Sequence, residues 1–365
     1  MSGVALAQHM CDEFAFGSGL EICQTVKMVQ VKERNKSMQA AFYEQTGAAA
    51  QVLHVGEVDD PQPGPHDVRV RLRWSGVNPS DVKSRAGLRN PAMPFPRVVP
   101  HSDGMGVIDA VGAKVAGDRV GQRVWIWNAG WGRANGSAAQ FVVLPQQMAV
   151  PLPDGCSDEV GACLGIPAMT AMHAVLACGG VAGQRVLVAG GAGAVGHYAL
   201  QFCRLLGARQ VLCTVSSAAK AAIALQAGAD LAINYRTDSV RERVIEVTQG
   251  QGVDRIIEVD LAANAALDLE LLRPNGQLMV YGSGKPALEL PFFPLIVHNL
   301  SLAFFIVYNL PAAARQHAQT TLDGFLRRDA LRHNIALRVP LAQIVRAHEA
   351  VEQGAVAGNV VVQIP

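Results

Sequence analysis

A glycine-rich turn between a short apolar run and a helical segment constrains this chain more than any other feature. Residues 186–189 (Val-Leu-Val-Ala) predict a buried strand, and a helix is expected to begin near Ala194. The turn between them carries Gly190, Gly193 and Gly196. A strand that leads into such a turn and a helix brings backbone N–H groups and the positive helix end together. This arrangement predicts a pyrophosphate site, with Gly193 admitting the phosphate and Gly196 letting the helix pack close to the strand.

Glycine-alanine turns also close ordinary αβ units that bind nothing, so the surrounding pattern must decide. Beyond Cys163, strand-like runs begin near residues 186, 210, 231, 255 and 277, and alanine-rich segments such as 218–227 separate them. This alternation predicts successive right-handed βαβ units in a doubly wound parallel sheet. The first turn of such a sheet is where a dinucleotide pyrophosphate binds. The pattern therefore favours a ligand site at the glycine turn.

The preceding part of the chain has a different texture. From Met38 to about residue 160 the pattern is all-β, because short runs such as Val68–Trp74 alternate apolar and polar residues. Clusters of glycine, proline and asparagine punctuate these runs, as turns do. These features predict a glycine-rich β-barrel or sandwich rather than a helical domain.

The last part of the chain returns to mixed patterning. We expect a helix over 312–327, a strand near 336–339, an amphipathic helix over 341–352 and a final strand over 359–364. These elements could complete the first domain. The predicted organisation is therefore a leader over 1–37, a catalytic domain over 38–160 completed by 310–365, and a dinucleotide-binding domain over 161–309.

Composition limits the classes of partner. Residues 1–37 show no strand alternation, and we interpret them as a disordered leader or as sequence upstream of the natural start, with a targeting peptide as the alternative. The net charge is +1 and no basic block stands out, so neither nucleic acid nor an acidic membrane surface is implied. Apolar runs are too short to span a bilayer. The seven cysteines contain no C-x-x-C pair, which favours a reduced, cytoplasmic protein.

An ordered series of motifs identifies a family. They are Gly76-Val-Asn-Pro-Ser-Asp, Pro100-His-Ser-Asp-Gly-Met-Gly, Gly117-Asp-Arg-Val, Pro151-Leu-Pro-Asp, Gly165-Ile-Pro-Ala-Met-Thr-Ala and Gly190-x-x-Gly-x-x-Gly. In this order they resemble the medium-chain dehydrogenase/reductase superfamily, and within it the zinc-free quinone oxidoreductases of zeta-crystallin type. The resemblance extends over almost all of 38–365. It implies an α/β fold with a GroES-like, β-rich catalytic domain and a Rossmann doubly wound parallel sheet.

Metal use divides that superfamily. Zinc alcohol dehydrogenases have a cysteine near the segment Val77–Asp81 and a Gly-His-Glu where residues 101–103 read His-Ser-Asp here. Asn78 is not a thiolate, Ser102 stands at the expected histidine, and residues 38–155 contain no cysteine for a structural zinc lobe. Zinc takes Cys, His or carboxylate ligands in a tetrahedral set. The sequence therefore predicts no metal site.

The choice of cofactor follows from the region after the glycine turn. NAD enzymes place an acidic residue about 20 residues beyond the turn to bind the ribose 2′-OH. Here the stretch 214–220 carries no acid but offers Ser216, Ser217 and Lys220, which could bind a 2′-phosphate. A lysine on a solvated helix face is the plain alternative. The resemblance points to the same three residues and adds Tyr235, so NADPH is the expected cofactor.

The remaining site residues come from the resemblance. It implies that Ala194 and Val195, with the glycines of the turn, and the stretch Tyr281, Gly282 and Ser283 contact the cofactor. It also implies that Asn78 and Thr170 lie beside the nicotinamide, where an amide and a hydroxyl can stabilise charge on the acceptor oxygen. The alternative roles are an ordinary Asn-Pro turn and a helix cap.

The expected activity is NADPH-dependent reduction of quinones or α,β-unsaturated carbonyls. Lys83 stands where some relatives have a tyrosine, so an enoyl or alkenal reductase of the same fold is the first alternative. A nucleotide-binding protein without turnover is the second, because zeta-crystallin-type proteins include lens crystallins and RNA-binding members. The resemblance further implies a homodimer, for which residues 299–309 could supply either an edge strand or a buried one.

Overall fold

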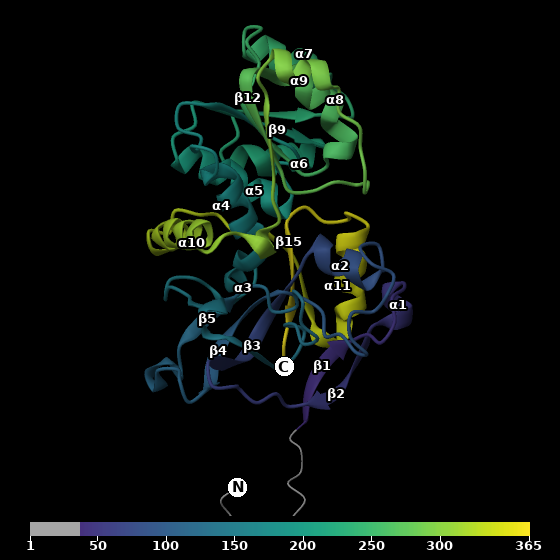
Figure 1. Cartoon of the computed structure of the whole chain (residues 1–365), viewed down its shortest axis with the longest axis vertical. Helices are drawn as coiled ribbons and strands as arrows, with labels where there is room; N and C mark the ends of the chain where they lie inside the picture. Colours follow the sequence, from purple (N-terminus) through teal and green to yellow (C-terminus); the bar gives the residue numbers. More distant parts are fainter. Residues whose placement is uncertain (1–36) are drawn as a thin grey trace, which may run out of the picture. The chain divides into compact units, whose positions relative to one another are not determined.

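A computed structural model describes residues 37–365 of the chain. The expected leader lies outside the described residues, apart from Ser37, which opens the first strand. Within the described range, no helix has the length and apolar character needed to cross a bilayer. The backbone forms one large mixed sheet, one parallel sheet and one small hairpin, coloured along the sequence in Figure 1.

The large sheet has seven strands in the order β14-β15-β3-β4-β5-β7, with β6 paired to β3 off this path. The strands built from the first half of the chain are β3 (Asp67–Val77), β4 (Asp103–Val111), β5 (Arg123–Ile126), β6 (Phe141–Pro145) and β7 (Ala149–Pro151). Each of their pairings is antiparallel. In β3, Val68, Val70 and Leu72 are buried and alternate with more exposed arginines, which is the pattern of a sheet with one face on the core.

A separate hairpin pairs β1 (Ser37–Phe42) with β2 (His54–Asp59), and the short helix α1 (Ala49–Val52) connects them. A second short helix, α2 (Pro79–Arg85), follows β3. The all-β expectation for this region misses both helices. The reason for α2 is local: Asn78 is the N-cap, Pro79 occupies the first turn and the Asp81 side chain accepts a bond from the Asn78 N–H.

The parallel sheet has six strands in the order β10-β9-β8-β11-β12-β13. Its members are β8 (Arg185–Val188), β9 (Gln210–Val215), β10 (Leu231–Asn234), β11 (Val253–Glu258), β12 (Leu272–Val280) and β13 (Ser301–Phe304). The first strand is central, and the order reverses between β8 and β11. This is the Rossmann arrangement, whose ligand crevice lies at the carboxyl ends of the strands where the order reverses.

Helices join these strands as the sequence pattern predicts. They are α5 (Ala194–Leu205), α6 (Ala218–Gln226), α7 (Val240–Val247), α8 (Leu261–Leu271) and α9 (Phe292–Val297). Before the sheet come α3 (Asp158–Gly161), a π-helical turn (Leu164–Ala168) and α4 (Met169–Leu176). Arg255 of β11 is fully buried and donates to the carbonyls of Ala174 and Ala177, so a cation satisfies the end of α4.

The C-terminal elements are α10 (Ala312–Arg327), β14 (Ile335–Pro340), α11 (Ile344–Glu352) and β15 (Asn359–Gln363), close to the expected bounds. β15 pairs antiparallel with β3, and β14 adds a parallel strand, so the end of the chain completes the large sheet. Figure 1 shows α11 (yellow) beside α2 although the two lie far apart in sequence. In contrast, α10 packs against α4, and its Leu322 and Phe325 join the core that includes Tyr198 of α5.

Candidate active site

The glycine turn lies where β8 ends and α5 begins. Gly190 has φ +70°, a left-handed conformation that favours glycine. A Cβ on Gly196 would collide with the Gly190 carbonyl, so only glycine lets α5 approach the strand this closely. Gly193 is the N-cap of α5, and Ala194 and Val195 form its first turn. The turn therefore aims backbone N–H groups at the reversal point of the sheet, which suits an anionic ligand.

The next strand ends in a small polar cluster. Ser216 and Ser217 follow β9 directly, and the Ser217 hydroxyl caps α6 by accepting from the Lys220 N–H. The Lys220 ammonium donates to Ser216 Oγ over 3.1 Å. The structure thus brings the three residues together at the strand adjacent to the glycine turn.

The other expected cofactor residues lie at the carboxyl ends of β10 and β12. Tyr235 follows β10, donates its N–H to the Val215 carbonyl and exposes its side chain. Tyr281, Gly282 and Ser283 follow β12. A Cβ on Gly282 would collide with the Val259 carbonyl, so this segment runs tightly against the end of β11. Every residue expected at the cofactor therefore lies at the carboxyl ends of the strands of the parallel sheet.

Asn78 joins two buried carboxyl groups near the start of α2. Its backbone N–H donates to Asp81 Oδ2 over 2.8 Å, and its side-chain amide donates to Asp103 Oδ2 over 2.9 Å. All three residues are buried. A Cβ on Gly165 would collide with Asp103 Oδ1, so the π-helical turn before α4 also lies against this cluster.

Thr170 is the second residue of α4 and does not cap that helix. It is buried, with 4% of its surface exposed. The segment that leads into Thr170 packs against the cluster of Asn78, Asp81 and Asp103. Gly165, five positions before Thr170, lies directly against Asp103.

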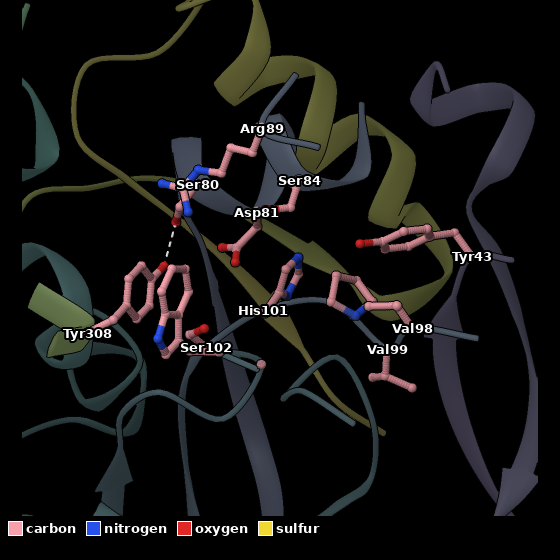
Figure 2. A pocket seen from close by; sticks show the side chains of 13 residues that line it. Tyr43, Ser80, Asp81, Ser84, Arg89, Val98, Val99, His101, Ser102 and Tyr308 are labelled. Atoms are coloured by element: carbon pink, nitrogen blue, oxygen red, sulfur yellow. Dashed lines mark hydrogen bonds between the residues drawn. The ribbon is translucent and has the colours of Figure 1, made fainter. Parts of the chain in front are cut away.

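A small pocket opens beside the Asn78 cluster (Figure 2). Its lining includes Ser80, Asp81, Arg89, His101, Trp131 and Tyr308. The Tyr308 hydroxyl donates to Ser80 Oγ over 2.8 Å, which joins a residue after β13 to one in α2. The pocket is therefore formed by both halves of the described chain.

An aromatic pair forms one wall of this pocket. The rings of Trp131 and Tyr308 stack with centroids 4.3 Å apart and an interplanar angle of 4°. Asn128 Nδ2 donates to the Tyr308 carbonyl over 2.9 Å, and Trp131 Nε1 donates to Asn309 Oδ1 over 3.2 Å. These contacts hold the wall in place. Trp131 is 38% exposed, and the Arg89 guanidinium carbon lies 6.0 Å from the centroid of its ring.

Burial controls the protonation of the acids around the pocket. It raises the pKa of Asp81 to about 7, although the bond from Asn78 and the nearby Arg89 cation act in the opposite direction. Burial and the like charge of Asp81 raise the pKa of Asp103 well above its usual range. Burial also raises the pKa of Tyr308. The pocket therefore favours neutral forms of its acidic groups.

His101 starts a buried chain of hydrogen bonds whose directions can be assigned. Ser137 Oγ donates to the Asp103 carbonyl, so Ser75 must donate to Ser137 over 2.9 Å. Ser75 Oγ then accepts from His101 Nδ1 over 2.8 Å, and His101 Nε2 accepts from His348 Nε2 over 2.9 Å. Burial lowers the pKa of both imidazoles, so both are neutral near pH 7.

Two family models match this chain, one in the β-rich part and one in the part that contains the parallel sheet. The alcohol dehydrogenase GroES-like domain model matches residues 64–154, and the zinc-binding dehydrogenase model matches residues 194–323. The quinone oxidoreductase of Pongo abelii is 30% identical over 297 residues, which cover 80% of this chain and 88% of that protein. The quinone oxidoreductase of Pseudomonas aeruginosa is 30% identical over 322 residues, covering 86% and 94%.

The chain belongs to the medium-chain dehydrogenase/reductase family and is quinone oxidoreductase-like. It is an oxidoreductase. Among solved structures, a mycobacterial protein complexed with NADPH matches with a TM-score of 0.80 and 28% identity, covering 90% of this chain and 100% of that one. The quinone oxidoreductase of Escherichia coli complexed with NADPH shares the fold, with a TM-score of 0.79 and 22% identity.

One matching family model is described as zinc-binding, so the donor set of this oxidoreductase must be tested against zinc. Asn78 and Ser102 stand where the zinc dehydrogenases of the superfamily have ligands, and neither is a thiolate or an imidazole. His101 is committed to Ser75 and His348. Across residues 37–365, no three His, Cys, Asp or Glu side chains are grouped so that they could hold a metal ion. The residues present do not fit zinc.

The sequence did not point to several residues of this site. No sequence motif assigns a role to Tyr308 or Arg89, and Asp81 and Asp103 occur only as members of longer motifs. Tyr308 follows the last strand of the parallel sheet, where sequence pattern gives no reason to expect contact with α2. A capping rule could have drawn attention to Asp81, because an acid three residues after an Asn-Pro start is a helix signal. Trp131 lines the pocket, whereas Trp125 and Trp127 are buried.

Proposed function

We propose that this oxidoreductase is a zinc-independent, NADPH-dependent reductase of quinones or α,β-unsaturated carbonyl compounds. The observation that carries the proposal is the cluster of Ser216, Ser217 and Lys220 beside the glycine turn. A ribose 2′-phosphate carries close to two negative charges, and it would meet hydroxyl donors and an ammonium there. The relatives that are named quinone oxidoreductases, and the mycobacterial neighbour complexed with NADPH, support the same reading.

The residues at the carboxyl ends of the parallel strands are suited to bind the dinucleotide. Gly190, Gly193, Ala194, Val195 and Gly196 would hold the pyrophosphate through backbone N–H groups. Tyr235 would lie beside the 2′-phosphate cluster. Tyr281, Gly282 and Ser283 would approach the cofactor from the end of β12. When bound, the nicotinamide supplies the hydride and both electrons.

The chain's own task is then to hold the acceptor and to stabilise charge on its carbonyl oxygen. Asn78 uses one side-chain N–H for Asp103, which fixes its orientation and leaves the second N–H for the acceptor. Thr170 would offer its hydroxyl as a second donor. The partly exposed side chain of Trp131 would give a flat acceptor an aromatic group to pack against.

Under this proposal the chain has two domains, as its sequence predicts. The catalytic domain is formed by residues 38–160 and 310–365, and the cofactor domain by residues 161–309. The hydrogen bond from Tyr308 to Ser80 joins the cofactor domain to the catalytic domain beside the pocket. An acceptor bound there would contact both domains. The free thiols of the five described cysteines support a reducing compartment such as the cytoplasm.

The functional unit under this proposal is a homodimer. Among the described strands, β13 pairs only with β12, so its other edge is open. Phe304 on β13 is 62% exposed, and the preceding α9 exposes Phe292 and Phe293 at 73% each. An open strand edge next to exposed aromatic side chains suits a two-fold contact with a second copy.

An acceptor panel tests the proposed function. Oxidation of NADPH is followed with quinones, enones, and saturated aldehydes and ketones as the comparison set, and NADH replaces NADPH in parallel. We expect turnover with quinones or enones and a preference for NADPH. Binding of NADPH without turnover of any acceptor would instead identify a non-catalytic nucleotide-binding protein.

A further inference from the structure

Asp81 is fixed in an orientation that exposes an acid to the pocket. It is the third residue of α2, it is 8% exposed, and its Oδ2 accepts the Asn78 N–H over 2.8 Å. Figure 2 shows its carboxyl group pointing into the pocket near the side chains of Tyr308 and His101. Because Oδ2 faces an N–H donor, a proton on this carboxyl group resides on Oδ1.

Several titratable or charged groups surround this carboxyl group. They are Tyr43, Arg85, Arg89, Asp103, His101, His348 and Tyr308. Arg85 is neutralised by Glu352 at 2.8 Å, and the two imidazoles are neutral near pH 7. Burial raises the pKa of Asp103 well above its usual range, which favours its protonated form. Arg89 is therefore the cation that favours ionised Asp81, and burial opposes it.

The hydroxyl and imidazole groups of the pocket are poor acids by comparison. Tyr308 donates its hydroxyl hydrogen to Ser80, and burial raises its pKa. The His101 Nδ1–H is committed to Ser75. Ser80 has only an alcohol proton. Among the described residues lining the pocket, Asp81 is the acid that can lose and regain a proton around neutral pH.

We propose that Asp81 is the proton donor of the reaction and delivers its Oδ1 proton to the carbonyl oxygen of the bound acceptor. This inference rests on the proposed function. Hydride addition moves an electron pair of the acceptor onto that oxygen, the O–H bond of Asp81 breaks, and a new O–H bond forms on the acceptor. Asp81 is left as a carboxylate, the dihydronicotinamide is oxidised, and water returns a proton to Asp81 before the next turnover.

The first test is the pH dependence of kcat in the wild-type protein, Asp81→Asn, Asp81→Glu and, as a control away from the pocket, the exposed acid variant Asp118→Asn. An acid donor must be protonated, so wild-type kcat should fall as pH rises through about 7. Asp81→Asn should lower kcat by about 10²–10⁴-fold and remove this pH dependence. Asp81→Glu should restore part of the rate, and Asp118→Asn should keep the wild-type rate and profile.

A second variant distinguishes proton donation from a structural role. Arg89→Gln removes the cation that stabilises ionised Asp81, so the midpoint of the kcat profile should move to higher pH. Acceptors whose reduced anions are weakly basic should lose less rate in Asp81→Asn than strongly basic ones. Infrared titration of the free protein should show a protonated carboxyl signal that disappears near neutral pH and is absent in Asp81→Asn.

The outcomes separate this inference from the proposed function. A wild-type protein that turns over quinones or enones while Asp81→Asn keeps its rate and pH profile would overturn the role of Asp81 alone. An unshifted midpoint in Arg89→Gln would also overturn it, even if Asp81→Asn failed to fold. A wild-type protein without turnover of any acceptor would remove the proposed function and this role together.

Discussion

The side-chain amide of Asn78 donates to Asp103 Oδ2 over 2.9 Å, and both side chains are almost fully excluded from solvent. The acid at the start of β4 therefore fixes the orientation of the amide at the start of α2. Because this bond uses only one amide hydrogen, the remaining N–H has a defined direction. The pairing gives Asn78 a rigid position without making it unavailable to a ligand.

Asn78→Ala should lower kcat by about 10²–10³-fold and leave the Kd for NADPH nearly unchanged, because the amide acts as charge develops on the acceptor. Steady-state kinetics measure the change in kcat, and fluorescence titration measures the Kd for NADPH. The substitution also leaves Asp103 Oδ2 without its partner, which should cost about 1–3 kcal/mol of folding free energy. A folded variant with wild-type turnover would return Asn78 to a purely structural role as the helix cap.

The sequence predicted the parallel sheet better than the pocket, for a physical reason. Strands such as β9 and β11 carry their pattern in consecutive residues, and the glycine turn and Lys220 cluster lie within short stretches. The pocket depends on distant pairs: Tyr308 and Ser80 are 228 positions apart, and His101 and His348 are 247 apart. No periodicity of a single sequence brings such pairs together.

The short helix α2 shows where a local rule would have improved the prediction. Glycine and proline around it favoured a turn between strands, and its seven residues are too few for a clear helical period. The capping residues Asn78 and Asp81 specify the helix start instead. Asn78 and Asp81 also belong to the buried group that includes Asp103, so the capping rule would have identified part of the site.

Lys220→Ala should raise the KM for NADPH by about tenfold to hundredfold and leave the KM for NADH almost unchanged, because a charge-assisted bond contributes about 1.5–3 kcal/mol. Steady-state kinetics with both cofactors measure the change, and Lys114→Ala serves as a charge-matched control on an exposed turn. Equal kcat/KM for both cofactors in the wild-type protein would contradict the assignment of the 2′-phosphate to this cluster.

Prolonged chelation should leave activity intact, because Asn78 and Ser102 offer no thiolate or imidazole to zinc. Elemental analysis of protein purified without added metal should give far less than one zinc per chain. A stoichiometric zinc content, lost together with activity on chelation, would show that other side chains complete a metal site.

Phe304→Asp should convert the proposed dimer to a monomer, because it places a charge on the open edge of β13. Sedimentation velocity measures the change, and Leu88→Asp is a control with a similarly exposed side chain. A wild-type protein that sediments as a monomer at micromolar concentration, or a Phe304→Asp variant that remains dimeric, would rule out this edge as the interface.

A buried acid pair formed by Glu258 of β11 and Asp268 of α8 should make stability depend on pH. Glu258 and Asp268 are 0% and 3% exposed, and each has an oxygen without a hydrogen-bond partner in the described part of the chain. Burial and the charge of Glu258 raise the pKa of Asp268 to about 9. The folded protein therefore holds a proton that the unfolded chain releases above a pKa of about 3.9.

The free energy of unfolding should consequently decrease as pH rises from about 4 towards about 9, where the folded protein also releases the proton. Asp268→Asn cannot ionise, so this variant should lose less stability than the wild-type protein between pH 6 and pH 9. Chemical denaturation across this range measures the difference, with the exposed Asp238→Asn as the control. Parallel pH profiles for wild type and Asp268→Asn would show that the pair does not hold its proton in the folded state.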